Sequence, residues 1–217
     1  MVLALAMVVS LETALESVAR MPPNAPAFIL GSSSSSRRAL LGATGASFET
    51  MVPDIDEKAI GDREGDPETL VRLVATSKAD ALVSKLPADS RVLLTGDQVV
   101  VFEGTIREKP VDVDECRAFI SSYGRCTTVG AVCLHALDTG KRVIGVHEAS
   151  VTFDPIPDTV VDALIKDHAD AMLQCAGGLM VEHPLLQPFV TEVSGGLDSI
   201  MGLSTHLVLR LLDDLAA

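Results

Sequence analysis

The chain has 217 residues, 47% of them apolar and 22% charged, which is typical of one or two globular domains and excludes a largely disordered protein. Asp and Glu number 30 against 17 Lys and Arg, so the net charge of −13 excludes a general binder of nucleic acid or of anionic membranes. It does not exclude a site for one small anion. The four cysteines form no Cys-x-x-Cys pair, which indicates reduced core thiols and a cytoplasmic location.

Residues 1–26 are expected to form an N-terminal extension. An apolar run continues through Leu11 and Leu15, which favours an accessory helix over a signal peptide, because the run has no cationic start. No apolar stretch is long enough for a transmembrane helix. Prolines between residues 22 and 26 predict the boundary with a single domain over residues 27–217.

The domain opens with a predicted strand over residues 27–30, followed at once by Gly31 and five serines. A helix is predicted from Arg37 to about Gly45, so the serines lie at a strand-to-helix junction. Such a turn presents backbone N–H groups and the positive end of the helix, and Arg37 adds a planar cation suited to phosphate oxygens. The alternatives are an anion site and a flexible linker. The segment lacks the Gly-Lys-Ser/Thr ending of a P-loop.

A weak strand is predicted over residues 47–52, and a helix begins at Asp66 and runs to about Lys85. Lys78 lies in the middle of this helix, and its simplest interpretation is a solvated surface residue. The acidic cluster that includes Glu57 precedes the helix, and its simplest interpretation is a solvated loop.

The triplet Gly96-Asp97-Gln98 interrupts strand-like sequence between residues 91 and 102. An unpaired carboxylate is costly to bury. Asp97 is therefore a turn residue, a buried residue with hydrogen-bond partners, or a carboxylate at a strand end that faces a cleft. Strand pairing across the Glu103-Gly104 turn would bring Lys109 back toward it.

The remaining elements are a helix over residues 112–124, a hairpin of two β-rich runs over 127–137 and 142–153, a helix from Pro157 and a last helix over 205–215. Crossover units together with an antiparallel hairpin predict an α/β protein with a mixed sheet. The five histidines show no metal-ligand spacing.

These segments together resemble the Maf, or septum-formation-inhibitor-like, family of nucleotide pyrophosphatases. The matching segments run in order from Phe28 to Leu212: residues 29–33 through 37–41, 54–57, 78–79, 96–100, 108–110, 176–178 and 198–203. Residues 106–110 and 182–185 look most like the eukaryotic branch. Ser35 stands where the family's common pattern has proline, and residues 1–26 lie outside the resemblance.

The resemblance implies two α/β lobes around a long mixed sheet with a deep cleft, often as a homodimer. It implies cleavage between the α and β phosphates of a nucleoside triphosphate, with Mg²⁺ or a similar ion such as Mn²⁺ or Co²⁺. By motif match, Asp97 is the catalytic carboxylate. Ser36, Gln98 and Glu182 match positions associated with substrate choice.

The charges fit this expectation independently. Arg37, Lys78 and Lys109, with the serine loop around Ser33, supply cations and N–H groups for the phosphates. Asp97 and Glu57 are the candidate metal ligands, because Mg²⁺ prefers carboxylate and phosphate oxygens. Asp97 would deprotonate a metal-held water that attacks the α-phosphorus in line.

Base choice follows from Gln98 and Glu182. An ionised glutamate only accepts hydrogen bonds, so it suits a base edge with adjacent N–H donors, as in guanine. We expect 7-methyl-GTP or a similar modified nucleotide first, then UTP, dTTP and CTP, in a house-cleaning role. Two alternatives are a non-catalytic nucleotide-binding regulator of cell division and a phosphatase that removes single phosphates.

Overall fold

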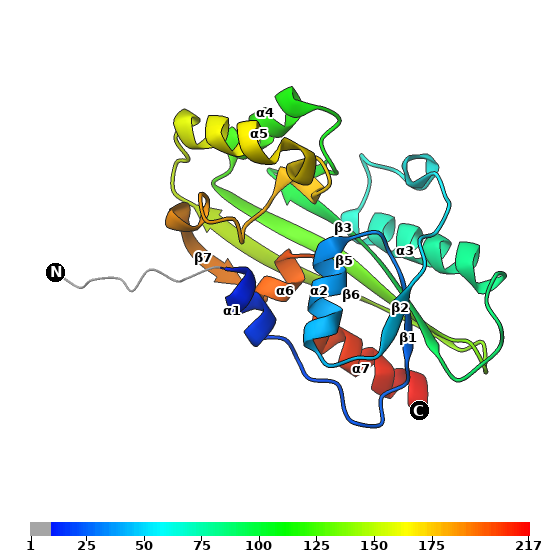
Figure 1. Cartoon of the computed structure of the whole chain (residues 1–217). Coiled ribbons are helices and arrows are strands. Elements are labelled where there is room, and N and C mark those ends of the chain that lie inside the picture. The colour runs from blue at the N-terminus through cyan, green and yellow to red at the C-terminus, as the bar shows by residue number, and fades with distance from the viewer. Residues whose placement is uncertain (1–9) are drawn as a thin grey trace.

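The computed structural model describes residues 10–217, and its centre is a seven-stranded sheet (Figure 1). The strands are β1 (Phe28–Gly31), β2 (Phe48–Thr50), β3 (Val92–Phe102), β4 (Thr105–Arg107), β5 (Arg125–Ala136), β6 (Arg142–Phe153) and β7 (Val190–Ser194). Their order is β2-β1-β3-β5-β6-β7, and β4 pairs with the other end of β3. β1 is parallel to both neighbours and every other pair is antiparallel, so the predicted mixed α/β sheet is confirmed.

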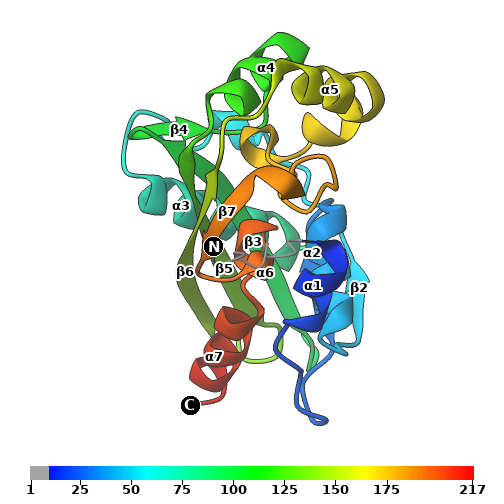
Figure 2. The same cartoon turned by 90° about the vertical axis from the view of Figure 1, so that its left-hand side faces the viewer.

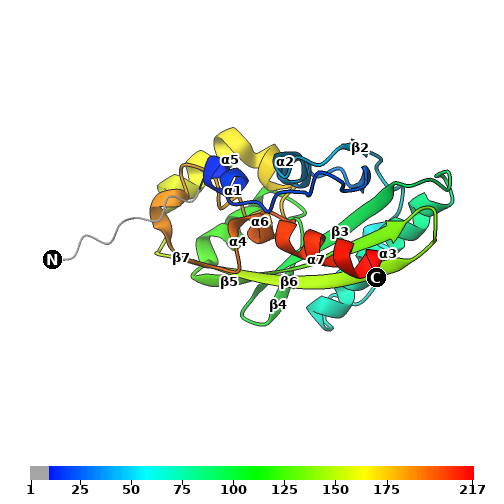
Figure 3. The same ribbon diagram turned by 90° about the horizontal axis from the view of Figure 1, so that it is seen from below.

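Helices cover both faces of this sheet. They are α1 (Leu11–Glu16), α2 (Ser35–Ala43), α3 (Pro67–Val83), α4 (Val113–Ser122), α5 (Asp158–Met172), α6 (Leu197–Ile200) and α7 (Thr205–Ala216), with short 3₁₀ turns at Glu57–Ala59, Ala176–Gly178 and Gln187–Phe189. Figure 3 shows α3 on one face and α1, α2, α6 and α7 on the other. Alternate residues of β3 serve the two layers: Leu93 packs with α3, and Leu94 packs in the larger core on the opposite face.

Three long strands, β3, β5 and β6, run through both ends of the molecule. α4 and α5 lie at one end of these strands, and β1, β2 and α7 lie at the other (Figures 1 and 2). These two ends are the two lobes that the family resemblance implies, and the long strands β3, β5 and β6 belong to both. No helix within residues 10–217 is long and apolar enough to cross a bilayer. All four cysteines are free thiols.

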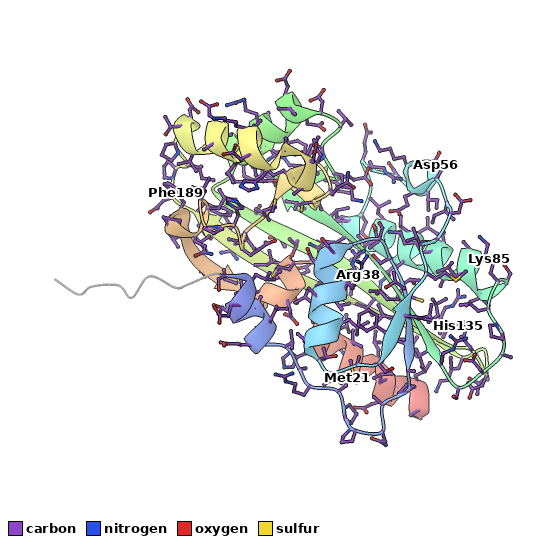
Figure 4. The ribbon with its side chains drawn as sticks, viewed as in Figure 1. Met21, Arg38, Asp56, Lys85, His135 and Phe189 are labelled. Carbon is purple, nitrogen blue, oxygen red and sulfur yellow. The ribbon has the colours of Figure 1, made fainter. Side chains whose placement is uncertain are left out.

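The extension before the domain packs on the core. Ala14 and Val18 are buried, and α1 contacts α2 and α6. After α1 the chain reaches the far end of α2, where the Met21 N–H donates to the Thr44 carbonyl at 2.9 Å (Figure 4). The described part of the expected accessory helix begins at Leu11, and the part predicted over residues 1–9 lies outside the described residues.

The structure differs from the sequence prediction in one place that matters for the site. The predicted interruption at Gly96-Asp97-Gln98 is wrong, because β3 runs unbroken from Val92 to Phe102. Its pairing with β5 continues through this triplet. On the other side, β1 pairs only as far as Thr95, and β4 pairs only from Val100 onward. The triplet therefore lies in the middle of a strand, beside a gap in the sheet between β1 and β4.

Candidate active site

A cleft of about 410 Å³ opens at this gap. It is lined by the serine loop, the middle of β3, the segment from the end of α5 to Glu182, and the turn after α6. All nine residues predicted from the sequence line it: Ser33, Ser36, Arg37, Glu57, Lys78, Asp97, Gln98, Lys109 and Glu182. The fold thus brings together side chains from both faces of the sheet.

The serine loop is an ordered turn, so the flexible-linker alternative is wrong. The Ser32 hydroxyl accepts from the Ser34 N–H at 3.2 Å, and the Ser34 hydroxyl caps α2 by accepting from the Arg37 N–H at 3.2 Å. Gly31 is needed just before it, because a Cβ there would lie 2.6 Å from Thr95 Cγ2. The first turn of α2 therefore lines the cleft with free N–H groups and the positive end of the helix dipole.

Arg37 is, with Lys78, one of two buried cations that line the cleft. Its Nε donates to the Gly202 carbonyl at 2.8 Å, and its Nη1 donates to the Ser32 hydroxyl at 3.4 Å. Burial lowers the pKa of the guanidinium, while the carboxylates of Asp97 and Glu57 oppose that shift. An arginine keeps its charge under such a shift, so a permanent positive charge borders the cleft.

Lys78 joins the two acidic residues of the site. Its ammonium group, on the buried face of α3, contacts Glu57 Oε2 at 2.7 Å and Asp97 Oδ1 at 2.9 Å, and it also lies 3.4 Å from the Gly96 carbonyl. The surface interpretation of Lys78 is therefore wrong, because the residue is 5% exposed. Three acceptors match its three protons, so a phosphate oxygen must replace one of them before Lys78 can bind it directly. Its role as a phosphate ligand stays a prediction.

Asp97 forms an ion pair with Lys78, yet its side chain is still accessible to solvent. Its side chain is 13% exposed and borders the cleft, because the gap between β1 and β4 leaves this stretch of strand uncovered. The prediction of a carboxylate that faces a cleft is confirmed. Its place at a strand end was wrong, because it is the neighbouring strand β1 that ends there.

The loops that carry Glu57 and Lys109 are tied together by Arg63. Its guanidinium donates to the Glu57 carbonyl at 2.6 Å and to both oxygens of the Glu108 carboxylate at 3.1 and 3.2 Å. The predicted pairing across the Glu103-Gly104 turn forms as β3 with β4. It returns the chain to the cleft, which the exposed Lys109 lines. Sequence reasoning had not found Arg63, because nothing in the local pattern links residues 45 apart.

The residues associated with substrate choice line another part of the same cleft. The Gln98 amide donates to the Ile200 carbonyl at 2.8 Å, and its Oε1 is buried without a partner among the described residues. Burial raises the pKa of the Glu182 carboxyl. The segment that leads to Glu182 turns at Gly177, which has a φ of 61° and whose carbonyl accepts from the Tyr123 hydroxyl at 2.8 Å.

The donor set fits a divalent ion. Glu57 and Asp97 both contact the same nitrogen atom, so two carboxylates converge on one part of the cleft. Two carboxylates plus substrate phosphates and waters are a typical arrangement for Mg²⁺. Within residues 10–217 no group of three or more His, Cys, Asp or Glu side chains converges, so an ion here would depend on the substrate for further ligands.

Comparison with known proteins identifies the family. The model of the family described as "Maf-like protein" matches residues 27–215. The chain belongs to the Maf family. The resemblance inferred from the motifs is therefore confirmed over nearly the whole predicted domain.

Three relatives illustrate the range within the Maf family. A protein named 7-methyl-GTP pyrophosphatase from Dictyostelium discoideum is 38% identical over 196 residues, which cover 87% of this chain and 96% of that protein. A protein named dTTP/UTP pyrophosphatase from Acholeplasma laidlawii is 31% identical over 188 residues, which cover 86% of this chain and 95% of that protein. A 7-methyl-GTP pyrophosphatase from Burkholderia lata is 35% identical over 65% of this chain and 68% of its own length.

Proposed function

We propose that this chain is a nucleoside triphosphate pyrophosphatase that hydrolyses the bond between the α and β phosphates and releases a nucleoside monophosphate and pyrophosphate. One observation carries the proposal: the Asp97 carboxylate borders the same cleft as the buried Arg37 guanidinium and the N-terminal turn of α2. The names of the relatives confirm the general prediction of a nucleotide pyrophosphatase, which is a hydrolase. The bond cleaved, the base, the ion and the roles of single residues are parts of the proposal.

The phosphates are bound by the cationic side of the cleft. Arg37, the N–H groups around Ser33 and the exposed Lys109 neutralise part of the triphosphate charge. The local cations are effective in a protein of net charge −13, because solvent screens distant charges beyond about 8 Å at physiological salt. The leaving pyrophosphate develops negative charge at the bridging oxygen, and Lys109 stabilises it there.

Asp97 acts as the general base. Its carboxylate accepts the proton of the attacking water, and the ammonium of Lys78 at 2.9 Å holds it in position. Asp97 and Glu57 would hold Mg²⁺, or Mn²⁺ or Co²⁺ in its place, which when bound neutralises phosphate charge and polarises the phosphoryl oxygens. Lys78 fixes both carboxylates at one point before substrate arrives.

The base is recognised by Glu182, Gln98 and Ser36. We rank 7-methyl-GTP first, because an ionised Glu182 accepts from the adjacent N–H donors of guanine, and the methylated ring carries a positive charge that a carboxylate favours. UTP, dTTP and CTP follow. The name of the relative from Dictyostelium supports the first rank, and that of the relative from Acholeplasma supports the second.

The cellular setting is part of the same proposal. We place the enzyme in the cytoplasm as a homodimer that removes unwanted nucleotides, with no nucleic-acid or membrane partner. The acidic net charge and the reduced thiols support this setting.

The test is a product analysis with purified protein, Mg²⁺ and a panel of triphosphates. We expect equal amounts of monophosphate and pyrophosphate, fastest with 7-methyl-GTP. Diphosphate with inorganic phosphate would indicate a phosphatase instead. Binding without any product would favour the nucleotide-binding regulator, and a preference for ATP would contradict the proposed base recognition.

A further inference from the structure

One backbone turn holds both Arg37 and Gln98. Arg37 comes from α2 and donates to the Gly202 carbonyl, while Gln98 comes from β3 and donates to the Ile200 carbonyl, both at 2.8 Å. Gly202 has a φ of 111°, and a Cβ on it would lie 3.6 Å from both Arg37 Nε and Gln98 Oε1. The turn over residues 198–202 therefore lies between the two side chains and sets where each points.

Asp198 fixes the shape of this turn. The residue is 5% exposed, and its Oδ1 accepts from the Ser199 N–H at 2.8 Å. Its Oδ2 accepts from both the N–H and the hydroxyl of Thr205, each at 2.8 Å. Because Thr205 begins α7, the carboxylate ties the turn to a long helix. Charge-assisted hydrogen bonds of this kind are among the stronger ones in proteins.

The Thr205 hydroxyl has a second partner outside the family domain. It is fully buried and accepts from the Ala19 N–H at 2.9 Å. Ala19 belongs to residues 10–21, here called the brace, which precede the start of the family match at residue 27. The brace also reaches α2, because the Arg20 side chain donates to the Ala43 carbonyl at 2.6 Å. Figure 2 shows α1 beside α2 and α6.

We propose that the brace is a positioning element of the active site, which acts through the chain Ala19 N–H to Thr205 hydroxyl to Asp198 carboxylate. It holds the turn that orients Arg37 and Gln98, so it controls triphosphate affinity and base selectivity. The hydrogen bonds and ion pairs that hold Asp97 and Lys78 lie on the α3 side of β3 and do not include the turn, so we expect the brace to affect binding more than the chemical step. This inference rests on the proposed pyrophosphatase activity for its kinetic readout.

The experiment compares Thr205→Val, Thr205→Ser and Ala19→Pro with the wild type in the full chain. Thr205→Val removes the hydroxyl, and Ala19→Pro removes the N–H donor while its ring also fixes φ at that residue. We expect Thr205→Val to raise KM for 7-methyl-GTP about tenfold with kcat within about twofold, and to change the preference for 7-methyl-GTP over UTP. Thr205→Ser restores both values. The matched control is Thr191→Val, whose exposed hydroxyl donates to the Thr152 carbonyl.

A double variant tests the chain itself. Because Ala19→Pro and Thr205→Val cut the same link, we expect the double variant to bind no more weakly than Thr205→Val alone. Fully additive effects, an effect on kcat alone, or KM values equal to those of the control in folded variants would overturn the inference. Should Thr205→Val fail to fold, Ala19→Pro and Thr205→Ser still decide it.

A second readout separates this inference from the proposed function. Calorimetric titration with α,β-methylene UTP measures affinity without turnover. If the wild type hydrolyses no triphosphate, the proposed function fails, and the inference is judged on this affinity alone. Weaker binding by Thr205→Val and Ala19→Pro than by Thr191→Val supports it, and unchanged binding overturns it.

Discussion

Replacing Asp97 by asparagine removes the proposed base while it keeps the shape of the site. The amide oxygen can still accept from the Lys78 ammonium, which also keeps Glu57 and the Gly96 carbonyl as partners. No buried charge is left unpaired, so we expect the free energy of unfolding to change by only about 1 kcal/mol. The fold therefore survives, and any loss of activity reports on the chemistry.

The loss is expected in kcat measured at saturating Mg²⁺, because Asp97 is also a proposed ligand of the ion. General bases contribute about 10²- to 10⁴-fold, so Asp97→Asn should raise the activation free energy by about 3 to 5 kcal/mol. Triphosphate affinity measured in EDTA should be unchanged or higher, because the variant removes one of the negative charges that line the cleft and leaves Arg37, Lys78 and Lys109.

The assay follows pyrophosphate release at saturating 7-methyl-GTP, with Asp138→Asn as the control. Asp138 is an exposed residue of the hairpin between β5 and β6, and its carboxylate only accepts from the neighbouring Thr139 N–H. A folded Asp97→Asn enzyme with kcat within about threefold of the control would refute the assignment of Asp97 as the base.

Three further predictions concern other groups. Burial raises the pKa of Glu182, so KM for 7-methyl-GTP should rise as pH falls through that pKa. The resulting fall of kcat/KM at acid pH should be absent in Glu182→Gln. A pH profile of kcat/KM in which the variant shows the same fall would contradict the prediction. Tyr123→Phe removes a bond to the Gly177 carbonyl and should cost about 1 to 2 kcal/mol in urea unfolding, whereas an unchanged midpoint would show that the bond is not stabilising. Burial lowers the pKa of His147 to about 4, so below pH 6.5 the unfolded chain binds a proton that the folded one does not, and stability falls as pH falls. The free energy of unfolding of His147→Gln should fall by up to about 3 kcal/mol less than that of the wild type between pH 6.5 and 4. Equal slopes of unfolding free energy against pH for the two proteins would contradict this prediction.

Local patterns predicted the elements of the fold well. The helix that begins at Pro67 follows an Asp cap, and the β5–β6 hairpin follows a clear turn signal. The edge strand β7 and the four-residue helix α6 were not predicted, because each is too short to show a period and is held by its tertiary neighbours. β3 was divided in error because a polar triplet normally ends a strand, whereas here its side chains border a cleft.

The site was predictable as a set of residues but not as a network. The order of the motifs predicted that Arg37, Asp97 and Lys109 belong to one site, and all three line the same cleft. The partners that hold them were invisible in the sequence. Arg63 acts on a glutamate 45 residues away, and Thr205 is bonded to an amide 186 residues away. Bonds at such separations leave no periodic or spacing signal.

The uncovered stretch of β3 presents neighbouring side chains to the two opposite faces of the sheet. Neighbouring residues of a strand point in opposite directions, so Asp97 faces the layer of α3 and Gln98 faces the layer of α2 and α6. Under the proposed roles, a nucleotide at this opening would meet the general base from the α3 layer, and Arg37 and Gln98 from the layer of α2 and α6. Because of this arrangement, a substitution at Gln98 can alter one side of the opening while the ion pairs of Lys78 with Asp97 and Glu57 on the other side keep their partners.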